Sequence, residues 1–111
     1  MVNHNLKLTI YFFSEEPIAA ARKLDLMNAD SAAAILQKIP ISAVSKVIYA
    51  MLPSKAAKVL ILTSNDFNRE LYEYLELADI AAILRYVGNG DRKRLIECIP
   101  ISRQTLCKLL I

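Results

Sequence analysis

Hydrophobic and polar residues follow one another along this chain with the spacing of short amphipathic helices. Between residues 28 and 62 one pattern occurs three times: a polar residue, an apolar stripe at helical spacing, and a break. A polar residue can cap a helix, and the residue before a proline is driven out of the helical conformation. We therefore expect three short helices with caps at Asn28, Ser42 and Ser54 and with ends at Pro40, at Pro53 and at residues 63–65.

The same spacing continues on both sides and predicts about eight helices in all. Further caps are expected at Ser14, Asp91 and Ser102, and a helix end at the glycine-rich residues 88–90. Most apolar stripes are expected to face a shared core. Three of them consist of Ile18, Ala21 and Leu24, of Phe67, Leu71, Tyr74 and Leu75, and of Leu106, Cys107, Leu109 and Leu110.

Residues 6–13 are the one stretch whose pattern fits two structures. They alternate and are rich in residues that favour strands. No later segment offers a partner strand, and a single strand is not stable alone. We therefore expect a first helix, with an extended arm as the alternative. The chain then divides into this N-terminal element, residues 1–13, and a helical-repeat domain, residues 14–111.

Two segments recur within the sequence. The pattern of Ala29–Leu36 reappears, one residue shorter, at residues 78–84, and Ile-Pro-Ile-Ser at residues 39–42 reappears at 99–102. Repetition of one helical unit is how arrays of helices bury a core through contacts between neighbours. The repeats predict an all-α superhelix.

Composition supports a helical, intracellular protein. Of 111 residues, 55% are hydrophobic and only 2 are glycine, which favours helices over a turn-rich sheet. The net charge of +3 is low for a nucleic-acid binder, and no apolar run is long enough to span a membrane. Cys98 and Cys107 match no metal or redox spacing, so we expect reduced thiols in the cytoplasm, with a disulfide between them as the alternative.

Two stretches carry a resemblance to a known family. Residues 52–60 place a hydrophobic residue and a proline before a helix of the form x-x-x-A-x-x-L/V-L, and residues 78–84 read Ala-Asp-Ile-Ala-Ala-Ile-Leu. In these motifs the chain resembles, over roughly residues 14–111, the N-terminal cytoplasmic domain of MgtE-type magnesium transporters. It is also similar to the helical repeats of the flagellar motor switch protein FliG.

The resemblance implies a right-handed superhelix of about eight short helices. In the transporters this domain precedes a pair of CBS domains and a membrane pore, and helps to sense cytosolic magnesium through acidic residues that face the CBS domains. It implies a protein partner or adjoining CBS-type domain, with this chain as a fragment or a stand-alone homologue. The chain departs from the family in its basic charge and in having alanine at Ala78 and Ala82, beside Asp79, where further acids are common.

Two charged groups are candidate sites. Glu73, Glu76 and Asp79 lie across a predicted helix corner and could together hold Mg²⁺, which prefers oxygen ligands; a solvated helix face is the alternative. Arg92, Lys93 and Arg94 begin a predicted helix, where the helix dipole disfavours basic residues. They predict a contact with an anion or an acidic partner, with solvent screening beside Asp91 as the alternative.

No pattern of catalytic residues is present. His4 is the only histidine, and no nucleophile or phosphate-binding motif occurs. Three tyrosines, Tyr72, Tyr74 and Tyr86, could mark an interface or be half-buried rings. We expect a non-enzymatic, cytoplasmic regulatory or interaction domain that requires no cofactor, with homo-oligomerisation as a further option. The alternative function is a FliG-like assembly module that works by stacking subunits.

Overall fold

The computed structural model describes the backbone of residues 2–111 and the side chains of residues 5–111, so His4 and Met1 lie outside the described side chains. This part of the chain forms nine helices and no strand. They are α1 (Val2–Glu15), α2 (Pro17–Leu26), α3 (Ala29–Leu36), α4 (Ile41–Ala50), α5 (Pro53–Leu60), α6 (Asn65–Tyr72), α7 (Leu77–Leu84), α8 (Asn89–Glu97) and α9 (Ile101–Leu110). The all-α prediction is confirmed.

The helices from α2 onward begin at a fixed interval. Their first residues are 17, 29, 41, 53, 65, 77, 89 and 101, so each starts twelve residues after the one before. The eighth residue of this twelve-residue unit is buried in the seven units from α2 to α8: Leu24, Leu36, Ile48, Leu60, Tyr72, Leu84 and Ile96. The recurrences seen in the sequence are therefore parts of a repeat that covers nearly the whole chain.

The prolines begin helices instead of ending them. Pro17 and Pro53 are the first residues of α2 and α5, where the missing N–H would have no partner inside the helix. Pro40 and Pro100 are the N-cap residues of α4 and α9. The expected caps at Ser42, Ser54 and Ser102 are wrong for this reason, because each of these serines lies inside a helix.

Other predicted helix ends are confirmed or corrected locally. Asn28 caps α3, and its side chain accepts a hydrogen bond from the N–H of Ser31 at 3.2 Å. Ser14 lies inside α1, which continues to Glu15, so Glu16 takes the N-cap position of α2. The helix end predicted at residues 88–90 is wrong, because α7 ends at Leu84 and Gly88 is the N-cap of α8. Asp91 therefore lies in the first turn of α8 and is not its cap. Residues 6–13 are helical, as expected.

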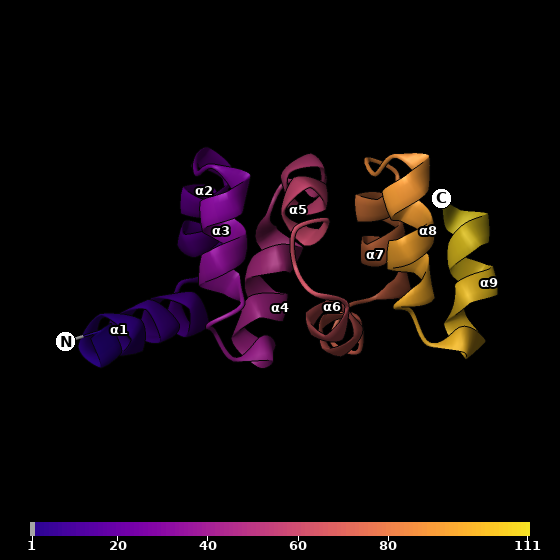
Figure 1. Ribbon diagram of the computed structural model, residues 1–111. Helices are drawn as coiled ribbons and strands as arrows, with labels where there is room; N and C mark the ends of the chain where they lie inside the picture. The colour runs from indigo at the N-terminus through magenta and orange to yellow at the C-terminus, as the bar shows by residue number, and fades with distance from the viewer. Residues whose placement is uncertain (1) are drawn as a thin grey trace.

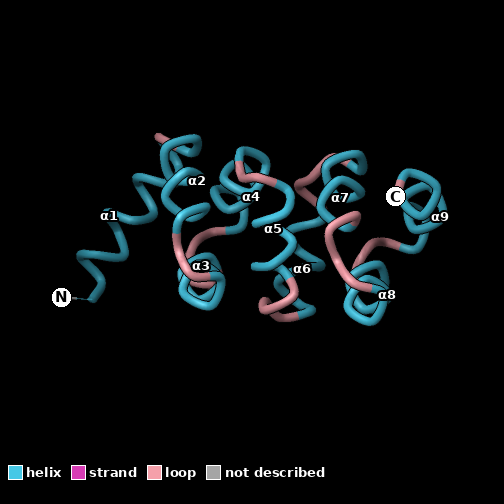
Figure 2. The backbone as a smooth tube through the Cα atoms, turned by 90° about the horizontal axis from the view of Figure 1, so that it is seen from above, coloured by secondary structure: helices cyan, strands magenta, loops and turns pink. Residues whose placement is uncertain are grey.

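From α2 onward the helices pack in two rows, in which most helices lie against the next but one. One row contains α2, α4, α6 and α8, with direct packing of α2 on α4 and of α4 on α6. The other contains α3, α5, α7 and α9, each packed on the next. Figure 2 shows the rows exchanging sides: α2 and α4 lie on the side that α7 and α9 occupy farther along. The array measures 44 × 24 × 21 Å.

The point of exchange is marked by α6. In Figure 1, α6 is seen nearly end-on, whereas α3 and α8 stand upright. Its buried Asn68 donates to the carbonyl of Leu60 at 3.2 Å and accepts from the hydroxyl of Thr63 at 2.6 Å. These bonds tie the start of α6 to the end of α5, so the change of direction has a fixed geometry.

Three predicted core stripes contain residues that face solvent. Ala21, Leu24, Leu71, Leu75 and Cys107 are buried as expected. The predictions of burial are wrong for five residues, with exposed fractions of 66%, 56%, 54%, 78% and 39% for Ile18, Tyr74, Leu106, Leu109 and Leu110. Tyr74 lies in the turn between α6 and α7 instead of on a helix face, and the outer face of α9 has no helix of the described chain beyond it.

Candidate functional site

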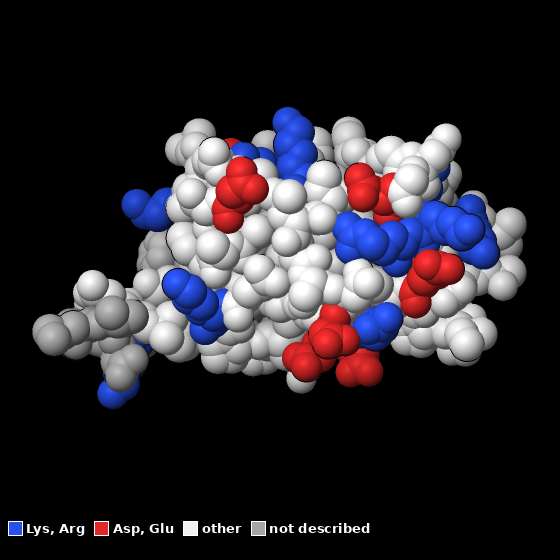
Figure 3. Space-filling view, in the orientation of Figure 1, with Lys and Arg blue, Asp and Glu red and all other residues white. Residues whose placement is uncertain are grey.

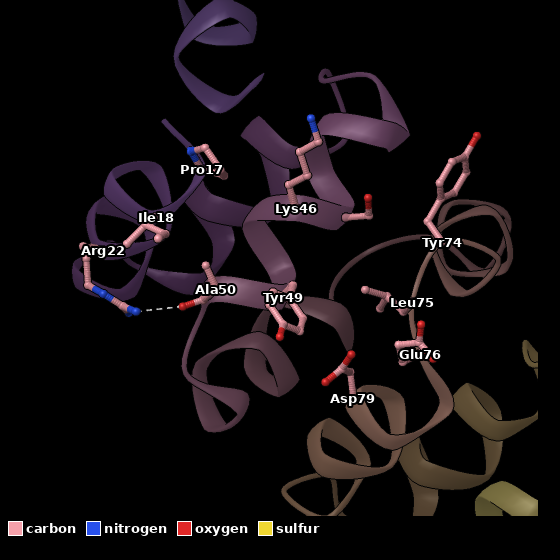
Figure 4. Close-up of a pocket in the computed structure, with 11 residues that line it drawn as sticks. Pro17, Ile18, Arg22, Lys46, Tyr49, Ala50, Tyr74, Leu75, Glu76 and Asp79 are labelled. Atoms are coloured by element: carbon pink, nitrogen blue, oxygen red, sulfur yellow. Dashed lines mark hydrogen bonds between the residues drawn. The ribbon is translucent and has the colours of Figure 1, made fainter. Parts of the chain in front are cut away.

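A groove of about 580 Å³ lies where the two rows exchange sides. One wall is formed by α2 and α4, and the other by the turn after α6 and the start of α7. It is open along its length and is large enough to take several side chains of a partner. We call it the central groove (Figure 4).

The central groove has an apolar floor and aromatic rims. Its apolar lining includes Ile18 from α2, Ala50 from α4 and Leu75 from the turn after α6. Tyr49 and Tyr74 stand on its two walls, with exposed fractions of 70% and 56%. Exposed aromatic and aliphatic side chains gathered in one concavity are typical of interaction sites.

Charged residues occupy both walls of the central groove. Arg22 is engaged within the chain, since it bonds the Asp25 carboxylate at 2.6 Å and the carbonyl of Ala50 at 2.9 Å. Lys46, on the same wall, makes no ion pair with a described residue. On the other wall, Glu76 and Asp79 likewise make none, and Glu76 is the N-cap of α7 without a side-chain capping bond.

The predicted magnesium ligands are only partly gathered. Glu76 and Asp79 both line the central groove, whereas Glu73 follows α6 and does not. Among the described residues, no cluster of three or more acidic, histidine or cysteine side chains is arranged to hold a metal ion. Mg²⁺ is usually held by one or two carboxylates and keeps several waters, so Glu76 and Asp79 could supply only part of its six ligands.

The predicted basic contact, residues 92–94, is divided between two helix ends. Arg94 donates to the carbonyl of Ile61 at 2.9 Å and to the side chain of Asn65 at 2.8 Å. Arg92 donates to the carbonyls of Val87 and Arg85 at 3.2 and 3.4 Å. Both guanidinium groups thus donate to backbone carbonyls at the ends of α5 and α7, which have no N–H donor inside the helix.

Lys93 remains exposed. With Arg92 and Lys108 it lines a hollow of about 300 Å³ between α8 and α9, into which Glu97 also projects a negative charge. Figure 3 shows basic side chains gathered over this end of the array. The predicted anion contact therefore rests on Lys93 and Lys108 more than on the arginines.

Basic side chains cap other helix ends in the same way. Arg103 donates to the carbonyls of Tyr72 and Leu75, each at 3.2 Å. Lys55 donates to the carbonyl of Met27 after α2, and Arg85 donates to that of Leu110 at the end of α9. A positive charge at the C-terminal end of a helix also interacts favourably with its dipole. Much of the basic excess thus has a role inside the fold.

Tyr72 differs from the two exposed tyrosines of the predicted interface. It is 1% exposed, and its hydroxyl has no hydrogen-bond partner among the described residues. Burial raises its pKa, and the nearby Cys98 and Cys107 act in the same direction. Both cysteines are buried free thiols whose own pKa values are raised by burial, so the alternative of a disulfide is not realised.

The sequence did not predict the central groove as a site. It located Tyr74, Glu76 and Asp79 but missed Ile18, Lys46 and Tyr49, which come from helices far earlier in the chain. One signal was available: Tyr49 is a large aromatic residue outside the apolar stripe of its own helix, which is unusual for a residue that only fills a core. Joining the two walls required knowledge of how the rows pack.

Within the described chain, no helix combines the length and the apolar character needed to cross a membrane. No family model and no curated protein matches this sequence. The function is therefore inferred from the residues of the groove and from the resemblance that the sequence motifs carry.

Proposed function

We propose that this chain is a non-enzymatic interaction domain that regulates a second protein by docking against it through the central groove. The observation that carries this proposal is the combination of an apolar floor, two exposed tyrosines and charged groups without partners in one concavity. The apolar and aromatic side chains are costly to leave in water, and such residues contribute most of the binding energy when a partner covers them.

The resemblance to the MgtE N-terminal domain supports the regulatory part of this proposal. The proposal includes a right-handed superhelix that presents helix corners to a partner. A CBS-type domain is one candidate partner. Two rows of short helices that exchange sides are compatible with such a superhelix. In the same proposal the protein acts in the cytoplasm.

A selection of helical peptides displayed on phage tests the docking role without knowledge of the partner. We expect binders whose affinity falls at least about tenfold on Tyr49→Ser/Tyr74→Ser, because exposed aromatic residues often dominate an interface. Tyr11→Ser/Tyr86→Ser, which removes two exposed tyrosines outside the groove, is the control. Peptides that bind both variants equally well would show that the groove is not the docking site.

A thermal melt tests the magnesium part of the resemblance. A site with a dissociation constant of about 0.1 mM should raise the free energy of unfolding by about 2.7 kcal/mol at 10 mM Mg²⁺. Calcium is the control ion, and Asp79→Asn should remove the increase. A melt that Mg²⁺ leaves unchanged would contradict a magnesium site within the isolated chain.

Assembly by subunit stacking is the second candidate function, and the outer face of α9 favours it. Ile101, Leu106 and Leu109 are 86%, 54% and 78% exposed there, at the end of a row. Exposed apolar residues on the outer face of a helical repeat can pack against a further repeat. Sedimentation measured over a range of concentrations should then show association that Leu109→Lys reduces. A monomer at all concentrations would contradict stacking.

A further inference from the structure

We propose that the central groove selects an amphipathic helix whose apolar stripe is flanked by a lysine or arginine. This inference rests on the proposed docking function and adds the chemistry of the partner. It arises from the end of the groove at the start of α7, where two carboxylates lie near the ring of Tyr49 on the opposite wall.

The first step is the position of the acidic groups. Asp79 and Tyr49 line both the central groove and a smaller hollow next to it, so the carboxylate and the ring are close neighbours. Figure 4 shows Glu76 near the same end of the groove, while Lys46 points away from it. A cation at this end would lie near two carboxylates and an aromatic ring, each of which attracts positive charge.

The second step is the balance of charge. Arg22 is neutralised by Asp25, which leaves Lys46 and the pair Glu76 and Asp79 as the groove charges without ion-pair partners in the described chain. The dipole at the start of α7 offsets only about half a unit charge. The α7 end of the groove is therefore negative, and the opposite wall carries one positive charge.

The third step is the shape of the occupant. The apolar residues of the floor come from three separate elements, which are α2, α4 and the turn after α6. Together they form an open trough instead of an enclosed pocket. A helix that projects side chains at i, i+3, i+4 and i+7 fits such a trough. An extended strand would gain less, because the walls are helices and offer no edge of unpaired backbone groups.

Three synthetic peptides of about fifteen residues test the proposal. They share one leucine stripe at helical spacing and differ only in a flanking residue, which is Lys, Gln or Glu. Fluorescence anisotropy measures their dissociation constants at low and moderate salt. We expect the Lys peptide to bind about fivefold more tightly than the Gln peptide at low salt, since two partly exposed ion pairs account for a difference of that size.

Two matched double variants distinguish an ion pair with the acids of the groove from a general effect of the net charge of the protein. Glu76→Gln/Asp79→Asn should bring the Lys and Gln peptides to the same affinity and remove the salt dependence of the difference. Glu70→Gln/Glu73→Gln removes the same charge from exposed acids outside the groove and should preserve the preference. Circular dichroism melts confirm that both variants fold.

The outcomes distinguish the partner chemistry from the docking role. Equal affinities for all three peptides, or tighter binding of the Glu peptide, would overturn the inference while the groove remains a docking site. Binding of none of them, together with failure of the displayed peptides, would overturn the docking role as well. Self-association of the chain that Glu76→Gln/Asp79→Asn abolishes would also overturn the inference, because it would assign the groove to a second copy.

Discussion

At the residue scale, Tyr72 shows how one position can depart from a repeat. The equivalent positions in the neighbouring units hold leucine or isoleucine, which fill the same space without a polar atom. The phenol ring fills the core, but its buried hydroxyl lacks a hydrogen-bond partner in the described chain. Such a group loses its bonds to water without replacement, which costs about 1–3 kcal/mol.

We therefore expect Tyr72→Phe to stabilise the protein by about 1 kcal/mol at neutral pH. Urea unfolding followed by circular dichroism measures the change. Tyr86→Phe, which removes a hydroxyl from an exposed ring, should leave the free energy of unfolding nearly unchanged. A loss of stability on Tyr72→Phe would mean that the hydroxyl has a partner, such as an ordered water molecule.

The raised pKa values of the buried thiols and of Tyr72 also predict a loss of stability in alkali. In the unfolded chain, cysteine and tyrosine ionise at their ordinary pKa values of about 8.5 and 10. In the folded chain these groups hold their protons to higher pH. The unfolded state therefore binds fewer protons above about pH 8.5, and the free energy of unfolding must fall as the pH rises.

Urea titrations between pH 7 and pH 11 measure this decline. Cys98→Ala/Cys107→Ala should reduce the slope above about pH 8.5, and Tyr72→Phe should reduce it above about pH 10. Slopes that all three substitutions leave unchanged would contradict burial of these groups as its cause.

At the element scale, the short helices depend on side chains from their neighbours. A helix of eight residues leaves about as many backbone groups without partners at its ends as it pairs inside. In α5 (Pro53–Leu60), the carbonyl of Ile61 just beyond the helix accepts a hydrogen bond from Arg94 of α8. Arg94 thus both satisfies a carbonyl at the end of α5 and joins α5 to α8.

We expect Arg94→Ala to reduce the free energy of unfolding by about 1–2 kcal/mol, through loss of two hydrogen bonds and a charge at a helix end. Lys93→Ala provides the control. The side chain of Lys93 is exposed, so this substitution should change the free energy of unfolding by less than about 0.5 kcal/mol. Equal effects of the two substitutions would show that the bonds of Arg94 contribute no net stability.

The sequence predicted helices more reliably than their ends or their arrangement. Apolar spacing identified α3, α4 and α7 because burial on one helix face is a local property of the pattern. The starts of α4 and α5 were predicted at the serines that follow Pro40 and Pro53, because a proline is compatible with both the end of one helix and the start of the next. In the structure the helices start at or directly after these prolines. The double role of Arg94 depends on contacts across thirty-three residues and has no local signal.

At the scale of the whole molecule, the array has an interior and two ends. Central helices such as α4 and α5 bury residues against neighbours on more than one side, whereas α9 buries only Cys107. In a linear array each unit is stabilised by the units that it touches, so terminal helices open more readily than central ones.

Native-state hydrogen exchange measures this gradient. We expect amides of α9 to exchange at least about tenfold faster than those of α4 and α5, because their opening exposes less apolar surface. Protection that is equal along the chain would show that the array unfolds only as a single unit.

The interval of twelve residues has a consequence for how such a molecule can change in length. A segment of one unit added ahead of α7 would move every later helix into the opposite row and turn the acidic wall away from Tyr49. A segment of two units would return each helix to its own row, with the same faces outward. Growth of this protein by tandem duplication would therefore keep each helix in its own row only in steps of twenty-four residues, twice the spacing between consecutive helix starts.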